Sequence, residues 1–459
     1  MSDRLRISLL VTATSLALGA CTAGAAPPPQ PESAGGPAGS PNILIITVDT
    51  LRADHLGTYG YWRPTSPNID AWAKETVLWE KAVTPMATTL PAHVSIMTGT
   101  YPLEHRVTRN GIRFQPKANL RPVAAVLREA GYETVAFVSA SPVNPGTGIE
   151  KGFDHFDHPP RKVSRRGEIT TRRVLQWLKK RKSDKPLFMW IHYWDPHDPY
   201  EPPKDHLSLF RHGDDLKAWL AKVNAPLTKK IGRVTFDVQD VHNRYDGEIH
   251  YLDSEVGKLF DGLRSMKLYD ALTIALTSDH GEGLWQHNWH DHGRIWNEEI
   301  FVPLMIKPPK GSAVKPRRMK HMVSTVDVLP TLDAIVDIPW PDSFAAQMSG
   351  VNALQDKKRQ VLTERVHVRR TGWEPGRKYS LTGDTWKYFM LTRGKDQLYK
   401  ISDDWFEQKD VADEHPEVSR TMKETITAVM ARQASRASGK PPQVNKQLME
   451  KLRSLGYME

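Results

Sequence analysis

Three apolar runs along the chain predict buried β-strands. They occupy residues 42–48, 187–193 and 272–276, where β-branched and aromatic side chains follow one another without polar alternation. Helical patterns lie between them. Residues 244–264 space their apolar side chains three or four positions apart, and residues 123–130 end before a glycine, a common helix terminator. Strands that alternate with helices predict an α/β fold with a mostly parallel sheet flanked by helices.

The last quarter of the chain has a different pattern. Residues 361–391 alternate enough to predict a few antiparallel strands, and residues 416–435 have a helical pattern. A chain of 459 residues suits one large α/β domain with an appendage. We therefore expect a main, catalytic domain over residues 41–345 and a small C-terminal α+β subdomain with terminal helices over residues 346–459.

The N-terminal segment has the pattern of a secretion signal. Arg4 and Arg6 precede an apolar run over residues 7–18, which is too short to span a bilayer. The run leads to small residues and then to Cys21, the only cysteine, so no internal disulfide can form. This arrangement is typical of a bacterial lipoprotein and predicts a signal peptide over residues 1–21 with lipidation of Cys21.

The segment after Cys21 predicts a tether. Residues 22–40 are rich in Ala, Pro, Gly and Ser and show no apolar periodicity, as in a flexible linker. We expect a domain held by lipid at the bacterial cell envelope, facing the periplasm or the exterior. The alternative is a plain secretory signal that happens to contain a buried cysteine.

Composition and charge narrow the classes of function. The chain is 39% hydrophobic and 25% charged, a balance typical of a folded globular protein. Its net charge is +10, and basic runs lie at residues 161–166, 179–182 and 315–318. Such runs are commonly solvated, and they can also attract anionic lipids or an anionic substrate. Because no stacking aromatic residues interleave with them, we expect no nucleic-acid partner, and no obligatory protein partner is evident.

Polar side chains follow the predicted strands at the points where each strand ends. Asp49 comes directly after the first strand, Asp195 and His197 follow the second, and Asp279 and His280 follow the third. Ligands of open α/β sheets bind at the carboxyl ends of the strands, so we expect these side chains to meet at one edge. Carboxylates and imidazoles together suit a divalent cation. For Asp49, a turn cap is the alternative.

A further stretch, residues 88–102, carries a hydroxyl and an imidazole close together. Thr89, Pro91 and His93 lie where a loop is expected to lead into a helix, and a hydroxyl at a helix N-terminus suits a nucleophile. An ordinary Ser/Thr-capped helix start is the alternative.

A histidine-rich loop follows the third strand. His287, His290 and His292 crowd into it, which is hard to explain by packing alone, although a solvated polar loop is an alternative.

These motifs resemble the sulfatase family of the alkaline phosphatase superfamily. The resemblance extends over residues 41–336 and continues more weakly to residues 397–399 and 452–457. It is carried by residues 41–57, 66–70, 88–102, 195–200, 245–249 and 278–283. It implies an alkaline-phosphatase-like fold and a hydrolase that acts on an anionic ester.

One motif departs from the common sulfatase pattern. Sulfatases carry a cysteine or serine, converted to formylglycine, at the head of a Cys-x-Pro-x-Arg signature, and here that frame begins with Thr89 and ends with His93. Formylglycine cannot form from threonine. The frame is similar instead to the Thr-x-Pro-x-His of nucleotide pyrophosphatases and phosphodiesterases, which use threonine as the nucleophile. The resemblance implies Thr89 as the nucleophile and His93 as a second catalytic residue.

The same branch of the superfamily implies one or two divalent ions, with Zn or Mn favoured and Ca or Mg as alternatives. The implied ligands are Asp49, Thr89, Asp279 and His280 for the first ion, and Asp195, His197 and His292 for the second. Asp246 and His250, four residues apart on one predicted helix, are a lower-ranked rival pair for the second ion.

Three further residues are expected to bind substrate, namely Asn110, His287 and Arg294. The Arg-Asn-Gly sequence at Asn110 also fits a simple turn. Taken together, the sequence predicts a metal-dependent hydrolase of sulfate or phosphate esters of small molecules, glycans or lipids, with phosphoesters favoured. The alternatives are a phosphoethanolamine-type transferase and an inactive binding module on the same fold.

Overall fold

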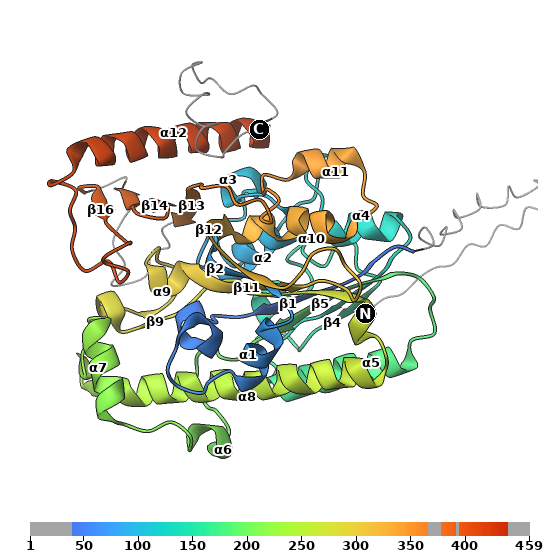
Figure 1. Cartoon of the computed structure of the whole chain (residues 1–459), viewed down its shortest axis with the longest axis horizontal. Coiled ribbons are helices and arrows are strands. Elements are labelled where there is room, and N and C mark those ends of the chain that lie inside the picture. The colour runs from blue at the N-terminus through green and yellow to red at the C-terminus, as the bar shows by residue number, and fades with distance from the viewer. Residues whose placement is uncertain (1–38, 366–377, 392–393, 439–459) are drawn as a thin grey trace, which may run out of the picture. The chain divides into compact units, whose positions relative to one another are not determined.

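The computed structural model describes residues 39–365, 378–391 and 394–438. Its centre is an eight-stranded sheet in the order β12-β2-β11-β8-β1-β5-β3-β4 (Figure 1). The strands are β1 (Asn42–Val48), β2 (Val77–Val83), β3 (Glu133–Phe137), β4 (His155–Asp157), β5 (Leu187–Tyr193), β8 (Leu272–Ser278), β11 (Phe301–Lys307) and β12 (Arg317–Ser324).

The direction of the strands confirms the predicted sheet. Only β11 runs antiparallel to its neighbours β2 and β8, and all other pairs in the eight-stranded sheet are parallel. The carboxyl ends of β1, β5 and β8, which lie side by side, therefore share one edge of the sheet.

Helices cover both faces of the sheet (Figure 1). One face is covered by α2 (Thr89–Thr98), α4 (Val123–Glu129) and α10 (Val328–Val336), and the other by α1 (Pro67–Ala73), α5 (Gly167–Lys180) and α8 (Val238–Ser265).

The two covered faces explain why β1 is apolar throughout. Ile43 and Ile45 belong to the apolar cluster shared with α2 and α10, whereas Leu44 and Ile46 belong to the cluster shared with α1 and α8. Successive side chains of a strand point to opposite faces, so both sets are buried. Each such burial stabilises the fold by roughly 1.5–3 kcal/mol relative to exposure.

The C-terminal part has its own antiparallel sheet, as predicted. Its four strands, β13 (Val361–Arg365), β14 (Lys378–Thr382), β15 (Lys387–Leu391) and β16 (Gln397–Tyr399), pair in chain order. Helix α12 (Pro416–Ser438) packs against it through an apolar cluster that includes Leu381, Tyr388 and Ile426.

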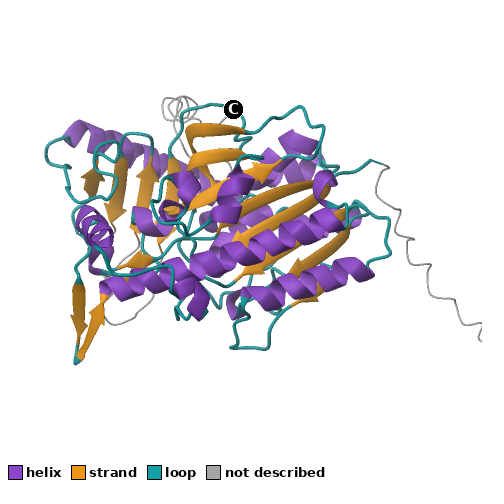
Figure 2. Cartoon of the chain, turned by 60° about the horizontal axis from the view of Figure 1, so that its bottom comes forward, coloured by secondary structure: helices purple, strands orange, loops and turns teal. Residues whose placement is uncertain are grey.

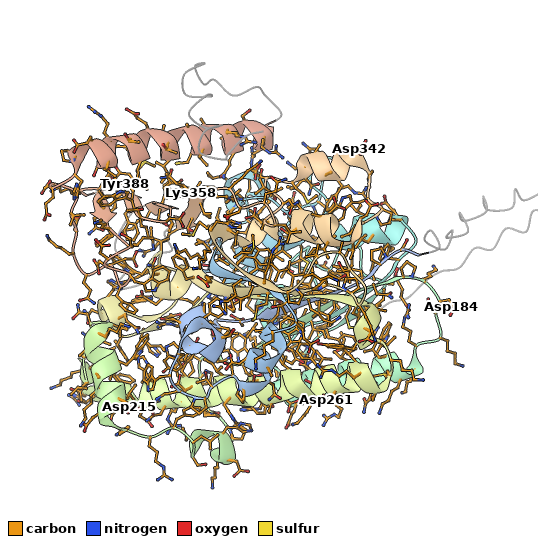
Figure 3. The ribbon with its side chains drawn as sticks, viewed as in Figure 1. Asp184, Asp215, Asp261, Asp342, Lys358 and Tyr388 are labelled. Atoms are coloured by element: carbon orange, nitrogen blue, oxygen red, sulfur yellow. The ribbon has the colours of Figure 1, made fainter. Side chains whose placement is uncertain are left out.

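Shorter elements connect the layers. They are η1 (Ala53–His55), η2 (Gly57–Tyr59), α3 (Pro102–His105), η3 (Ser141–Val143), α6 (Lys204–Leu207), α7 (Asp214–Lys222), β6 (Thr228–Ile231), β7 (Val234–Asp237), η4 (Tyr269–Ala271), β9 (Gly283–Leu284), η5 (Gln286–Asn288), β10 (His290–Asp291), α9 (Asn297–Ile300), η6 (Thr325–Asp327) and α11 (Asp342–Gln347). Side chains fill the space between sheet and helices, while charged residues such as Asp184 and Asp261 lie at the periphery (Figure 3).

The longest helix begins earlier than its apolar pattern indicates. The sequence predicts a helix over residues 244–264, whereas α8 starts at Val238. Asp237 caps this start, because its side chain accepts hydrogen bonds from the backbone N–H groups of Gln239 and Asp240. The cap stabilises an additional polar turn that carries little apolar periodicity.

The predicted signal peptide (1–21), with Cys21, lies outside the described residues, as does nearly all of the predicted linker (22–40). Within the described ranges, no helix combines the length and the apolar character that crossing a bilayer requires.

Asp246 on α8 anchors a buried polar network. Its carboxylate accepts hydrogen bonds from His55 Nδ1 at 2.8 Å, the Tyr61 hydroxyl at 2.9 Å and Arg63 Nη1 at 2.9 Å. His250, four residues along the helix, contacts a histidine of α6 instead. The two side chains of this rival metal pair therefore have separate partners. Asp246 joins η1 and the loop after η2 to α8.

Replacement of Asp246 tests this network. In Asp246→Leu, the Arg63 guanidinium stays buried without its counter-charge, and the free energy of unfolding is expected to fall by about 3–5 kcal/mol. Urea unfolding of this variant and of His250→Ala measures the difference. His250→Ala is the control, because the His250 side chain is less buried and lies outside the network, and its free energy of unfolding should fall far less. Equal losses in the two variants would contradict the role of Asp246 as the anchor of the network.

Candidate active site

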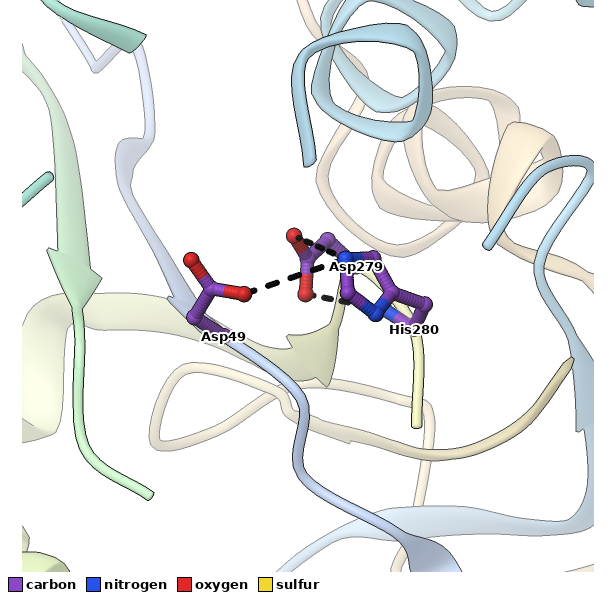
Figure 4. Close-up of side chains that lie close together, drawn as sticks. All are labelled: Asp49, Asp279 and His280. Carbon is purple, nitrogen blue, oxygen red and sulfur yellow. Dashed lines mark hydrogen bonds and ion pairs between the residues drawn. The ribbon is translucent and has the colours of Figure 1, made fainter. Parts of the chain in front are cut away.

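The pairing of β1 with β8 brings the first acidic residues together. The two strands are parallel, and Val48 lies opposite Ser278, so the next residues, Asp49 and Asp279, come side by side at the edge of the sheet. His280 Nε2 lies 3.8 Å from Asp49 Oδ1 and 3.4 Å from Asp279 Oδ2 (Figure 4). All three side chains are fully buried. The structure thus gathers three of the four predicted ligands of the first ion into one cluster.

The atoms that face one another in this cluster are all acceptors. His280 Nδ1 donates to the carbonyl of Gly281 at 2.9 Å, so in the neutral ring its Nε2 carries a lone pair. Both oxygens of Asp49 and Oδ2 of Asp279 are buried without a hydrogen-bond donor among the described residues. Unpaired buried acceptors are costly, and a divalent cation would satisfy all of them at once.

The charges of the cluster point the same way. Burial raises the pKa of Asp49 and of Asp279, and the nearby charge of Asp49 adds to the effect on Asp279. Burial also lowers the pKa of His280 well below its ordinary value. For both carboxylates to stay ionised at such short range beside a neutral imidazole, a positive charge must lie between them.

His192, on the neighbouring strand β5, supports the cluster from behind, and the sequence analysis missed it. Its Nδ1 accepts a hydrogen bond from the Ser139 N–H, so its Nε2 carries the proton and faces Asp49 Oδ2 at 3.6 Å. Burial lowers its pKa to about 3, which keeps the ring neutral. His192 therefore lies beside Asp49 without a hydrogen bond to it. The one feature of the sequence that could have indicated His192 is its position at the end of β5, just before the polar residues that follow this strand.

Thr89 is the first residue of α2, and His93 ties it to the sheet. His93 Nδ1 donates to the Thr89 carbonyl at 2.7 Å and lies 3.6 Å from Asp279 Oδ2. Its Nε2 accepts from the Thr47 hydroxyl at 2.9 Å, because that hydroxyl itself accepts from Trp190 Nε1. Both ring nitrogens are thus engaged, and burial holds the pKa of His93 well below its ordinary value. These contacts suit a positioning residue better than a proton carrier.

Asn110 lies at the same helix start. Its side-chain Oδ1 accepts a hydrogen bond from the Leu90 N–H at 2.9 Å, so it satisfies one of the free donors at the first turn of α2. The side chain also lines the cavity described below.

The three residues predicted for a second ion have separate partners. Asp195 Oδ2 accepts from the Gly167 N–H at 2.8 Å, and the His197 ring stacks on Trp194 with 3.7 Å between ring centroids. His292 lies 5.1 Å from His197 between ring centroids. Among the described residues, two groups of three side chains lie close enough together to hold a metal ion, and neither includes Asp195 or His197. The groups are Asp49, Asp279 and His280, and Glu282, Asp291 and His292.

His292 instead belongs to a cluster with Glu282 and Asp291. Its Nδ1 lies 3.3 Å from Glu282 Oε1 and 3.2 Å from Asp291 Oδ1. Burial opposes protonation of His292, but these carboxylates outweigh it and raise its pKa to about 10. Its ring centroid lies 4.4 Å from that of His280. His292 therefore stands beside the first cluster, and Glu282, which raises the pKa of His292, was not predicted.

A cavity of about 550 Å³ opens next to these groups. It is lined by Met86, Ala87, Thr88, Thr108, Arg109, Asn110, His197, Asp198, His290, Asp291, His292, Gly293, Glu364 and Arg365. Strand β13 of the C-terminal sheet contributes Glu364 and Arg365 to one wall. The C-terminal part thus shapes the space in which a substrate would bind.

Two predicted substrate-binding residues lie outside this lining. His287 Nδ1 contacts Glu298 Oε1 at 2.8 Å, and its ring stacks on Trp296 with 3.8 Å between centroids. The Arg294 guanidinium lies over the Trp289 ring at 4.0 Å. The structure therefore brings Asn110 to the cavity but gives His287 and Arg294 other partners.

A mostly parallel sheet with buried polar groups and a cavity at its carboxyl edge is typical of α/β enzymes. Residues 41–338 match the family model described as Sulfatase. The chain therefore belongs to the sulfatase family, and it is an ester-hydrolysing enzyme.

Individual relatives agree with this membership. An arylsulfatase from Clostridium perfringens is 21% identical over 79% of this chain and 88% of its own length. A choline-sulfatase from Rhizobium meliloti is 24% identical over 82% of this chain and 83% of its own. The crystal structure of a phosphonate monoester hydrolase of Agrobacterium radiobacter has the same fold, with a TM-score of 0.69, 19% identity, and coverage of 86% of this chain and 96% of that one.

The pairing of His287 with Glu298 predicts a pH-dependent contribution to stability. Burial opposes protonation, but Glu298 raises the folded-state pKa of His287 from 6.5 to about 9. The contribution is therefore fully present below pH 6.5 and is lost as the pH rises through about 9. Relative to the wild type, His287→Gln should lose about 3 kcal/mol of unfolding free energy near pH 6 and much less near pH 10.

Urea unfolding over this pH range measures the effect, with His197→Gln as the control. Burial lowers the pKa of His197 to about 3, so this ring stays neutral in both states near and above neutral pH. The control should differ from the wild type by a constant amount between pH 7.5 and 10. A His287→Gln difference that is equally constant would show that the ion pair is not formed.

Proposed function

We propose that the protein hydrolyses sulfate or phosphate esters through attack of the Thr89 hydroxyl, with one divalent cation beside it. The observation that carries this proposal is the buried cluster of Asp49, Asp279 and His280, whose facing atoms are all acceptors. His93 couples this cluster to the helix start that bears Thr89. A buried group of acceptors of this kind is costly unless it serves a ligand.

The donor set fits a divalent cation of the kind that sulfatases use. Asp49, Asp279 and His280 would hold it, with the Thr89 hydroxyl as a further ligand. Two carboxylate groups and one imidazole favour Zn or Mn over Ca or Mg. When bound, such an ion lowers the pKa of a neighbouring hydroxyl and offsets negative charge on an ester.

The chain's own residues then have distinct roles. Thr89 Oγ1 forms a bond to the sulfur or phosphorus atom, the bond to the leaving oxygen breaks, and water later cleaves the Thr89 ester. The N-terminus of the ten-residue α2 places the positive end of the helix dipole at Thr89, where negative charge develops. His93 and Asn110 hold that helix start in place.

We favour a phosphoester as the substrate. The carrying feature is Thr89, because threonine cannot become the formylglycine of sulfate-cleaving relatives and is itself a nucleophile in phosphodiesterases of the superfamily. The cavity of about 550 Å³ admits a leaving group of substantial size. We also propose that lipidated Cys21 tethers the enzyme to the bacterial envelope, where anionic esters of lipids and glycans are at hand.

Replacement of the nucleophile is the primary test. Thr89→Ala should lower kcat by about 10³-fold or more on the best of an aryl sulfate, a phosphate monoester and a phosphodiester, and Thr89→Ser should restore part of it. A steady-state assay measures this, with circular dichroism as the check on folding. Turnover that survives in Thr89→Ala would exclude the proposed nucleophile, and a metal-loaded wild type inert to all three substrates would favour a binding module.

The metal content of the purified protein distinguishes one ion from two. We expect about one divalent ion per chain by elemental analysis, little metal in Asp279→Asn, and wild-type content in Asp195→Asn. Chelation should abolish turnover, and Zn or Mn should restore it. Two ions per chain, with one lost in Asp195→Asn, would instead support the second site predicted from the sequence.

A further inference from the structure

An isolated β-hairpin precedes α8. Strands β6 and β7 pair only with each other, with Thr228 opposite Asp237 and Ile231 opposite Val234. Gly232 has a φ of +58°, which a two-residue turn between the strands requires. The hairpin projects from the body of the molecule (Figure 2). Its side chains are therefore available to a partner.

This hairpin concentrates the exposed apolar side chains of the described chain. Seven large hydrophobic side chains are exposed in the whole of the described chain, and four of them lie within positions 227–236. Leu227, Ile231, Val234 and Phe236 are 48%, 53%, 56% and 37% exposed. A clustered set differs from scattered surface hydrophobics, which are ordinary, and marks an interaction site.

Basic side chains accompany the apolar ones. Lys229, Lys230 and Arg233 lie on the same ten-residue hairpin, whereas its one acid, Asp237, is engaged as the cap of α8. The hairpin tip is thus apolar and cationic. A second copy of the chain would bring a like-charged hairpin to this surface, so self-association is disfavoured.

The base of the hairpin rests on the active-site loop. The Phe236 ring lies 5.7 Å from the Trp285 ring, and Lys229 Nζ donates to the side-chain oxygen of Asn288. Three and four residues beyond Asn288, the same loop carries Asp291 and His292. A partner bound to the hairpin would therefore lie next to the loop that lines the cavity.

We propose that the β6–β7 hairpin docks the enzyme on an anionic lipid surface. Apolar side chains that enter the headgroup boundary, flanked by lysine and arginine, are the features by which peripheral proteins bind such membranes. The tip residues Ile231 and Val234 enter the interface, while Lys230 and Arg233 contact the anionic headgroups. Docking would orient the active-site loop towards the lipid surface independently of the chemistry that the site performs.

The single cysteine makes this directly testable in the full chain. In a Cys21→Ser background, Val234→Cys accepts one environment-sensitive fluorophore at the hairpin tip. Its emission should shift to the blue with vesicles of phosphatidylcholine and phosphatidylglycerol, and far less with phosphatidylcholine alone. A matched label at Asp342→Cys, on exposed α11 across the sheet, should stay unchanged. Because each label reports its own surroundings, attachment elsewhere on the chain does not mimic the result.

Charge variants separate the contributions. Lys230→Gln with Arg233→Gln should lower partitioning onto the anionic vesicles about 30-fold. The same charge change at Lys179 and Lys180, in the last turn of α5, should have a much smaller effect. Ile231→Ser with Val234→Ser should also weaken binding. A tip label that does not respond to anionic vesicles, or that responds to protein concentration without vesicles, would overturn the proposal.

Discussion

The parallel pairing of β1 with β8 is the constraint on which the site depends. Because Val48 and Ser278 lie opposite each other, the following residues leave the sheet together and bury two carboxylates against one imidazole. Like charges this close cannot both remain ionised without a counter-charge. The apolar layers on both faces of β1 offset this repulsion, because their burial holds β1 and β8 in register.

Thr89, the proposed nucleophile, is tied to the same constraint by a short chain of hydrogen bonds. Trp190 donates to Thr47, Thr47 to His93, and His93 to the carbonyl of Thr89, so β5, β1 and α2 are linked behind the site. Each of these groups is buried and neutral, which makes the linkage insensitive to pH in the physiological range. His93 thus positions the start of α2 through two neutral hydrogen bonds.

The cluster of two carboxylates and one imidazole could be predicted from the sequence, whereas the side chains that surround this cluster could not. Asp49, Asp279 and His280 follow apolar runs that had to be central strands, so their meeting at one edge was foreseeable. His192 and Glu282 were missed, since a histidine inside an apolar strand and a glutamate in a glycine-rich turn have no distinctive spacing. His287 was predicted to bind substrate, but the structure stacks it on Trp296 and pairs it with Glu298.

By itself the sequence determined the alternation of strands and helices, because two-sided burial requires the continuous apolar runs of β1, β5 and β8. It also determined which chemical groups stand at the strand ends. The tertiary structure alone decided which histidines converge, that β11 runs antiparallel, and that the C-terminal strand β13 reaches the cavity. These outcomes depend on register and loop path between segments far apart in the chain, and local patterns of polar and apolar residues do not encode either.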